Sequence, residues 1–420
     1  MPPASRFRTN MSSPAASERR IGAQRGISLI ELMIGMVVAL VISLVMFNTL
    51  LFAEGQRRST SGGGDAQQAG SMASYMTERI VRMGGAGIER VSGLFGTCKL
   101  SLKNSTGTVL LPLPGTLVAP FDGLKSVTLR AAPVLIANAS VTANDTAGDT
   151  TPDALVVFGG TSPTINTWFQ ASSATTATTA HVIGSTGLAT GDLLVAVEQD
   201  STQANYGSAN PCVIAQTTSA IDTTTTSACY RQSTDYCGRV IKIGGTLTGS
   251  EGFAPGGNAY QGTTEFADLG GAPLLQILAL GPTPATATDL RSYNILDQSV
   301  LSLVDGVVNL QAVYGLRAAG NTANCTVTSW VPPTGNFSIS KLLDGTNAAS
   351  VARICAIRIG LITRSAIQEK NNVDAATTTG WTLFADDTAL KVTGTRSGTD
   401  LKYRYRQYDV IVPVRNQILQ

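Results

Sequence analysis

Among the side chains of this 420-residue chain that can take part in catalysis or bind metals, histidine is the scarcest. The single histidine, His181, lies in TTAHVIG, and no G-x-S-x-G or other nucleophile motif accompanies it. A two-histidine metal site is therefore excluded, and Ser-His-Asp catalysis would depend on this one residue. We expect His181 to be a strand residue, and we expect neither enzymatic activity nor a cofactor.

Three carboxylates recur every four residues in the stretch NDTAGDTTPD, namely Asp145, Asp149 and Asp153. Carboxylate oxygens are ligands that calcium prefers, so these residues are a calcium candidate. The favoured interpretation is a solvated acidic turn, and no metal site is predicted.

The cysteines form the third reactive group. Their number is even and no C-x-x-C motif is present, which favours disulfides in an oxidising compartment over metal ligation. The sequence leaves the pairing open, although three of them predict a local bridge within a Thr-rich segment. The alternative keeps one pair as buried thiols, with the cysteine at 355, inside an apolar stretch, as the first candidate. The six residues are Cys98, Cys212, Cys229, Cys237, Cys325 and Cys355.

The amino-terminal part of the chain contains a segment that we expect to span a membrane. Residues 27–53 are apolar except for Glu31. At about 1.5 Å per residue they form a helix of roughly 40 Å, enough to span a hydrocarbon core of about 30 Å. The arginines of residues 1–26 place that segment on the cytoplasmic side, so residues after about 54 are exported. A carboxylate at mid-bilayer costs about 2.5–3.5 kcal/mol, so Glu31 needs a partner or function unless it reaches the headgroups or is protonated.

Residues 54–84 are expected to continue this helix outside the membrane. Gly84 and Gly85 predict its end, and Gly62–Gly64 predict a flexible break. The larger apolar side chains fall on one helical stripe, which we expect to pack on the rest of the protein. They are Met72, Tyr75, Met76, Ile80 and Met83.

Residues 85–420 predict a β-rich head. Charged residues are 14% of the chain, against about 25% in ordinary soluble domains. Short apolar runs bounded by Gly, Pro, Asp and Asn indicate strands, and a short helix is expected at residues 297–309. A Thr/Ser-rich insertion at about 138–230 indicates surface loops, or alternatively a contact surface. The fold class is therefore α+β, with a long helical stem packed on a large, mostly antiparallel β head.

Basic residues near the carboxyl end alternate with apolar or aromatic residues. We interpret them as strand-edge charges beside tyrosine side chains; the alternative is a basic strip for a partner or DNA. They are Arg353, Arg358, Arg364, Lys402, Arg404, Arg406 and Arg415. The net charge of +2, with its positive excess at the amino end, argues against a dedicated nucleic-acid binder.

The string RGISLIE at residues 25–31, followed by the apolar run, resembles the type III signal of type IV prepilins and type II secretion pseudopilins. The resemblance implies that a membrane peptidase cleaves after Gly26, that Ile27 is then methylated, and that residues 1–26 are a leader, shorter if Met11 is the start. It also implies that Glu31 pairs with the terminal amine of a neighbouring subunit. Ile27 replaces the usual Phe of major pilins and Asn48 a frequent proline, which favours a minor subunit.

Three further segments, 78–88, 353–365 and 403–419, resemble PilW-type minor pilins, which are similar to J-type pseudopilins. The resemblance implies a pilin-type head and a minor pilin that primes type IV pilus assembly near the tip. Its implied partners are other minor pilins, the major pilin, a tip-associated adhesin and the prepilin peptidase. Its implied location is the bacterial inner membrane, as a single-pass protein with the head in the periplasm, and then the pilus surface. The alternatives are a J-like secretion pseudopilin and an anchored adhesin or DNA-binding tip protein.

Overall fold

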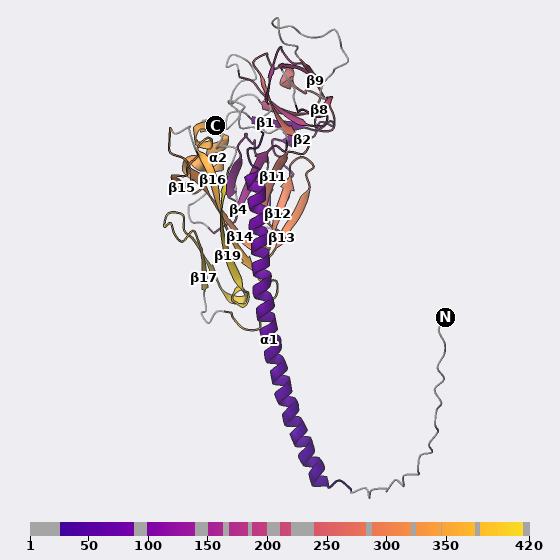
Figure 1. Cartoon of the computed structure of the whole chain (residues 1–420), viewed down its shortest axis with the longest axis vertical. Helices are drawn as coiled ribbons and strands as arrows, with labels where there is room; N and C mark the ends of the chain where they lie inside the picture. The colour runs from indigo at the N-terminus through magenta and orange to yellow at the C-terminus, as the bar shows by residue number, and fades with distance from the viewer. Residues whose placement is uncertain are drawn as a thin grey trace, which may run out of the picture. The chain divides into compact units, whose positions relative to one another are not determined.

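The computed structural model of the protein describes residues 26–87, 99–138, 150–162, 168–183, 187–199, 211–219, 239–282, 288–320, 325–345, 347–373 and 379–414. Residues 1–25 of the leader, parts of the Thr/Ser-rich insertion and Arg415 lie outside these residues. The chain divides between Arg57 and Arg58 into two units, which we describe separately. The described fold confirms the predicted α+β class (Figure 1).

Helix α1 (Leu29–Arg82) runs from the first unit into the second. Its hydrogen bonding begins where the amide of Leu32 donates to the carbonyl of Ser28 over 3.1 Å. In the first unit its apolar side chains are exposed, and no other described residue of that unit covers them. Its composition and length suffice to cross a membrane.

In the second unit α1 packs through small residues. The buried positions are spaced by three or four residues and so lie on one helical face. They are Gly62, Ala66, Gly70, Ala73, Thr77 and Val81. The predicted packing stripe is wrong in part, because Met72 and Tyr75 are 41% and 57% exposed. Met76, Ile80 and Met83 are half-buried at the margin of the core.

The predicted break at Gly62–Gly64 is also wrong, since α1 continues through these residues without interruption. At Gly62 and Gly63 the head instead comes close to the helix backbone. A Cβ on Gly62 would lie 3.3 Å from the Ser365 Cβ, and one on Gly63 would lie 3.7 Å from the Arg404 Cδ. The missing side chains therefore let the head reach the helix backbone.

Two antiparallel sheets build the part of the head that packs on α1 (Figure 1). The five-stranded sheet has the order β13-β12-β11-β4-β3, formed by Val300–Asp305, Asp289–Asn294, Leu274–Gly281, Asp153–Gly159 and Val134–Asn138. The four-stranded sheet has the order β15-β14-β16-β19, formed by Ser329–Val331, Val307–Leu316, Ile354–Arg364 and Tyr405–Pro413. Among the short apolar runs, which the sequence predicts to be strands, ALVVFGG lies in β4, PLLQILALG in β11, LQAVYGLRA in β14 and residues 353–365 in β16.

The helix predicted at residues 297–309 is wrong, because this segment forms β13, a turn and the start of β14. Turn chemistry decides it. The Asp297 carboxylate accepts hydrogen bonds from both the amide and the hydroxyl of Ser299, and Gln298 has a φ of 58°. Gly306, with a φ of 84°, then supplies the left-handed residue of the next turn.

Polar side chains join the two sheets. The amide of Ile136 in β3 donates to the Tyr314 hydroxyl in β14 over 2.6 Å. The amide of Ala312 donates to the buried Asp153 carboxylate over 2.7 Å. Helices α2 (Ile339–Leu343) and α3 (Ala348–Val351) follow β15. Elsewhere in the chain, 3₁₀ turns are formed by Asp122–Leu124, Pro255–Gly257, Gly335–Phe337 and Gly398–Lys402.

A hairpin of β17 (Thr379–Leu383) and β18 (Val392–Arg396) covers the other face of the four-stranded sheet. Trp381, Leu383 and Phe384 of the hairpin and its turn pack against Val313 of β14 and Ile362 of β16. The inner strands β14 and β16 of this sheet are therefore buried on both faces.

A third sheet contains a closed ring, formed by β8, β7, β10, β5, β6 and β9, with a core of its own, and β1 and β2 extend the sheet from β8. Its order is β2-β1-β8-β7-β10-β5-β6-β9, and a second pairing joins β9 back to β8. The strands are Val109–Leu111, Lys99–Lys103, Pro211–Ser219, Leu193–Val197, Glu265–Gly270, Trp168–Ala171, Thr179–Ile183 and Arg239–Ile243. Large side chains such as Phe253, Tyr260 and Phe266 fill it. Within 138–230, the described residues thus include strands β4–β8 and not only the predicted surface loops.

Candidate functional site

The amino-terminal end of α1 carries the residues predicted for processing and assembly. Gly26 has no neighbouring atom within 4 Å of a Cβ position, and Ile27 is 73% exposed. Glu31 is exposed in the first helical turn, where the positive end of the helix dipole favours a carboxylate. The larger apolar side chains from Ile27 to Phe52 are between 50% and 77% exposed. A surface of this kind requires lipid or other apolar helices around it.

The head holds the second half of α1 by its backbone. The Thr363 hydroxyl in β16 donates to the carbonyl of Ala66 over 2.8 Å. The Tyr408 hydroxyl in β19 donates to the carbonyl of Gln67 over 3.0 Å. These hydrogen bonds require α1 to lie close to the head. Gly70 allows this, because the Tyr408 ring lies where a Cβ on Gly70 would be.

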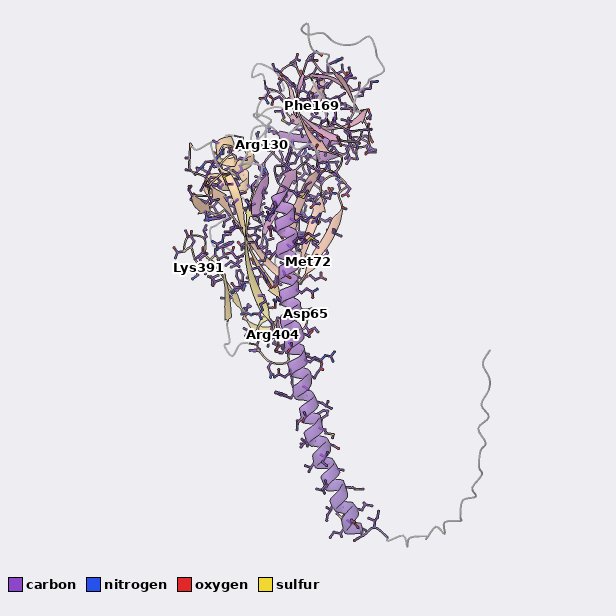
Figure 2. All side chains as sticks on the ribbon, viewed as in Figure 1. Asp65, Met72, Arg130, Phe169, Lys391 and Arg404 are labelled. Carbon is purple, nitrogen blue, oxygen red and sulfur yellow. A yellow bond between two sulfur atoms is a disulfide. The ribbon has the colours of Figure 1, made fainter. Side chains whose placement is uncertain are left out.

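Charged groups fix the lower contact between α1 and the head. The Arg404 guanidinium donates to the Ser59 hydroxyl of α1 over 2.6 Å, and its Nε donates to the Glu369 carboxylate over 2.6 Å. Figure 2 shows Arg404 close to α1. This cation is therefore committed to both the helix and a carboxylate.

The carboxyl-terminal end of α1 is fixed by the five-stranded sheet. The Gly85 amide donates to the Phe158 carbonyl over 2.8 Å, and the Gly160 amide donates to the Ala86 carbonyl over 2.6 Å. A Cβ on Gly84 would lie 2.6 Å from the Pro133 carbonyl oxygen. The glycines at this end, predicted from sequence as the helix stop, also admit the strand backbone.

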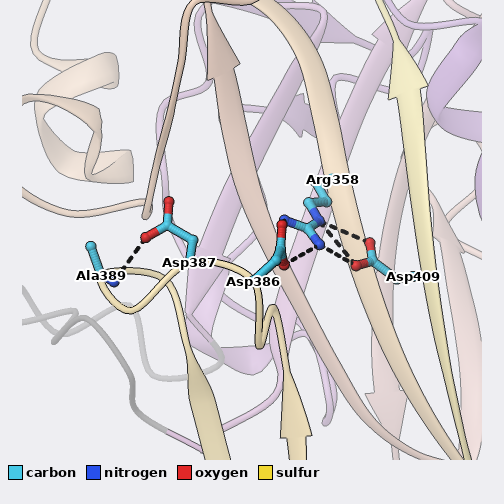
Figure 3. A network of polar contacts seen from close by, with 5 residues as sticks. All are labelled: Arg358, Asp386, Asp387, Ala389 and Asp409. Atoms are coloured by element: carbon cyan, nitrogen blue, oxygen red, sulfur yellow. Dashed lines mark hydrogen bonds and ion pairs between the residues drawn. The ribbon is translucent and has the colours of Figure 1, made fainter.

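A buried arginine joins the hairpin to the sheet that holds α1 (Figure 3). Arg358 of β16 is 8% exposed and lies between Asp386, in the β17–β18 turn, and Asp409 of β19. Its Nε donates to both Asp409 carboxylate oxygens over 3.0 Å, and its terminal nitrogens donate to Asp386 over 2.6 and 2.9 Å. Hydrogen bonds from Arg358 lower the pKa of Asp386, and the two carboxylates raise the pKa of Arg358. The Phe384 ring lies 5.0 Å from the guanidinium carbon.

Of the other basic residues near the carboxyl end, Arg364 also lies beside a carboxylate. Arg364 lies 3.6 Å from Asp400 and 4.7 Å from the Tyr403 ring centroid. Arg353 lies 5.9 Å from the Phe337 ring centroid, whereas Arg406 is exposed on β19. The predicted tyrosine packing is therefore confirmed at Arg364. The predicted edge position is wrong for Arg358 and Arg364, because β16 lies between β14 and β19.

Disulfide bonding is present in the described head. Cys325 pairs with Cys355 across 5.5 Å between Cα atoms, and Cys212 is disulfide-bonded as well. No cysteine among the described residues is free, so the alternative of Cys355 as a buried thiol is wrong. The remaining candidates, Cys98, Cys229 and Cys237, lie outside the described residues. The Cys325–Cys355 bond ties the segment before β15 to the central strand β16.

The remaining candidates occupy structural positions. His181 is a residue of β6, paired in register with Val240 of β9, as predicted. Asp153 is buried and its carboxylate accepts from β14, whereas Asp145 and Asp149 lie outside the described residues. In the part of the chain that the structure describes, no three His, Cys, Asp or Glu residues group as metal ligands do.

The small-residue face of α1 is the functional feature that the sequence analysis missed. Its signal was present as Gly and Ala at 62, 66, 70 and 73, but large apolar residues were given the packing role instead.

Comparison with known proteins identifies the head region that carries these contacts. Residues 287–416 match the family model of the type IV pilus-assembly protein W, PilW. The match runs from β12 to β19 and includes Thr363, Tyr408 and the Arg358 pairs. No curated protein and no solved structure matches the chain. The PilW-type resemblance is thus confirmed over this region, and the match supports a role in type IV pilus assembly.

Proposed function

We propose that the protein is a minor pilin that primes assembly of a type IV pilus, near its tip. In this proposal the apolar half of α1 first anchors the subunit in the inner membrane, with the head in the periplasm. It then packs among the stems of other minor pilins and the major pilin. The head contributes contacts with these subunits and with a tip-associated adhesin, and it carries no catalytic activity.

The observation that carries the proposal is Glu31, an exposed carboxylate in a helical stretch whose other side chains are uncharged from Ile27 to Ala53. Four helical residues rise about 6 Å, or roughly one turn, so an amine at Ile27 of one subunit and Glu31 of its neighbour can lie at similar depth. Opposite charges attract strongly where water is excluded. The pair would therefore set the axial register of an incoming subunit.

The proposed processing follows the same residues. Cleavage after Gly26 by the prepilin peptidase would create the amine at Ile27, and methylation would leave it cationic. Among the described residues no atom lies within 4 Å of a Cβ position at Gly26, which supports an accessible cleavage site. In a protein isolated from cells with this machinery, mass spectrometry is expected to find N-methylated Ile27 as the first residue.

The test is Glu31→Ala in a strain that lacks the native gene. Insertion and cleavage should be normal, because the change removes a charge that is costly in lipid. Fibre number should fall severely, because an unpaired cation in the stem bundle costs roughly 3–5 kcal/mol. Fibres are counted by electron microscopy, and immunoblots measure cleavage and abundance. The matched control is Ser43→Ala, which removes a hydroxyl that donates only to Ala39 within the same helix. Normal fibre number with a processed, abundant Glu31→Ala protein would refute the pairing mechanism.

The matched family favours a pilus over the alternative of a J-like secretion pseudopilus, because it is a pilus-assembly family. The tip-adhesin alternative draws on a different observation, the closed sheet with its own core, which lies outside the matched residues. Binding of the purified full-length protein to host cells would support it. A DNA-binding role is disfavoured by the carboxylates beside Arg358, Arg364 and Arg404.

A further inference from the structure

A groove of about 510 Å³ lies beside α1 in the second unit. One wall is a face of the helix, with residues at i, i+3, i+4 and i+7 from Asp65 to Met72. The opposite wall is formed by the β13–β14 turn and by the chain after β16. Figure 2 labels Asp65 and Met72 on α1. This face is distinct from the small-residue face that the head buries.

The groove has a fixed shape. The Arg364 amide donates to the Gly306 carbonyl over 2.8 Å, and the Gly306 amide donates to the Thr288 carbonyl over 2.7 Å. Gly306 has a left-handed φ of 84°, and a Cβ there would lie 3.5 Å from the Ala69 Cβ of α1. The groove is therefore preformed, which lowers the entropic cost of filling it.

Apolar side chains surround the groove. Ala69, Met72 and Val304 line it, and Met72 is 41% exposed. Ile367, which follows the lining residue Ala366 in the chain, is 49% exposed. Large exposed apolar side chains that gather at one place on a head indicate a protein contact.

The charge of the groove is negative. Asp65 and Asp305 line it, and neither carboxylate makes a hydrogen bond or ion pair with another side chain among the described residues. The one cation in the lining, Arg364, is 3.6 Å from Asp400 and lies over Tyr403. An occupant that matches the groove must therefore bring apolar side chains together with at least one Lys or Arg.

We propose that this groove docks the stem helix of a different pilin subunit, at the point where that helix changes from apolar to basic residues. The proposal rests on the minor-pilin function above. A stem that leaves the same membrane runs alongside α1, so it can offer a helical face to a groove that follows two turns of α1. Its apolar residues cover Met72 and Val304, and its cation meets Asp65 and Asp305.

A second copy of this chain is a poorer match. Its own boundary segment, LLFAEGQRR at residues 50–58, offers Arg57 and Arg58, but the first charged residue after its apolar run is Glu54, one turn before Arg58. Glu54 would bring a third carboxylate to the two in the groove, and like charges at close range are unfavourable. An anionic lipid headgroup is disfavoured for the same reason.

The experiment places the photoreactive residue benzoylphenylalanine at Met72 of the full chain, in cells that contain the pilus machinery. Irradiated adducts are purified and the joined peptide is identified by mass spectrometry. The expected peptide belongs to another pilin stem and contains Lys or Arg within one turn of its apolar run. The matched control has the same residue at Val118, which is 58% exposed and does not line the groove.

Charge is tested with the same adduct. Asp65→Asn together with Asp305→Asn should lower its yield by about three- to tenfold, because each exposed ion pair contributes modestly. Asp122→Asn, a surface carboxylate outside the groove, should leave the yield unchanged. An adduct to a second copy, to lipid or to a protein other than a pilin overturns the proposal. So does the absence of a Met72 adduct in a cleaved, abundant protein.

These outcomes separate the groove from the priming mechanism. Loss of the adduct with normal dependence of fibre number on Glu31 contradicts only the docking proposal. A pilin-stem adduct together with normal fibres from Glu31→Ala contradicts only the pairing mechanism.

Discussion

The fit of α1 against the head can be tested by making one chemical change at two helical glycines. Gly70 faces the Tyr408 ring, which occupies the place of a Cβ, whereas no atom lies within 4 Å of a Cβ position at Gly64. In an exposed helix interior, Gly→Ala stabilises by about 1 kcal/mol. We therefore expect Gly64→Ala to raise the free energy of unfolding by about that amount.

At Gly70 the stabilisation gained from Gly→Ala is smaller than the cost of the new methyl group against Tyr408. Overpacking costs about 1–3 kcal/mol, and displacement of Tyr408 loses its hydrogen bond to Gln67, about 1 kcal/mol more. The net effect of Gly70→Ala is a destabilisation of roughly 1–3 kcal/mol. The two variants should thus shift the melting temperature of the full chain in detergent in opposite directions.

The double variant Gly70→Ala/Tyr408→Ala identifies the cause. Removal of the ring makes room for the new methyl group, so the double variant should be less destabilised than the sum of the two single variants. Equal stabilisation by Gly64→Ala and Gly70→Ala, or strict additivity with Tyr408→Ala, would refute the proposed close contact.

Two further predictions concern the described head. Loss of the Cys325–Cys355 bond in a Cys325→Ala/Cys355→Ala variant should cost about 2–4 kcal/mol in urea unfolding, and non-reducing peptide mapping of the native protein should find this pair. Free thiols at both positions in periplasmic protein would contradict it. Arg358 lowers the pKa of Asp386 below its ordinary 3.8, so this carboxylate stabilises the fold above pH 3.8 and loses its effect as the pH falls through the lower folded value. The melting temperatures of the native protein and of Asp386→Asn should therefore converge on acidification, and a constant difference would contradict the assignment.

Local pattern was sufficient to predict the strands that are buried on both faces. The run RICAIRIGLITRS became β16, because a continuous apolar stretch bounded by polar residues has few other ways to be buried. The helix of the apolar stretch around Glu31 was equally predictable, since its length and composition meet the requirements of a spanning helix. These predictions needed no knowledge of what each segment contacts.

The packing face of α1 was not predictable by the same rule. Hydrophobic periodicity selects the largest side chains, and it selected Met72 and Tyr75, which are exposed. The head instead contacts the backbone of α1 through hydrogen bonds from Thr363 and Tyr408. Such contacts require small residues on the helix, so the informative pattern was the absence of side chains.

Long-range pairing explains why the closed sheet was not predicted. Strand β8 pairs with β7 before it, with β9 after it and in parallel with β1, which precedes it by about a hundred residues of chain. Most strands of the closed sheet are short, and Thr and Ser also occur often in surface loops. In the ring, Thr175 accepts from the Tyr260 amide over 2.9 Å and donates to the Phe253 carbonyl over 2.8 Å. Its hydroxyl therefore serves buried backbone groups rather than water, a role that depends on residues 78 and 85 positions away and that composition alone does not reveal.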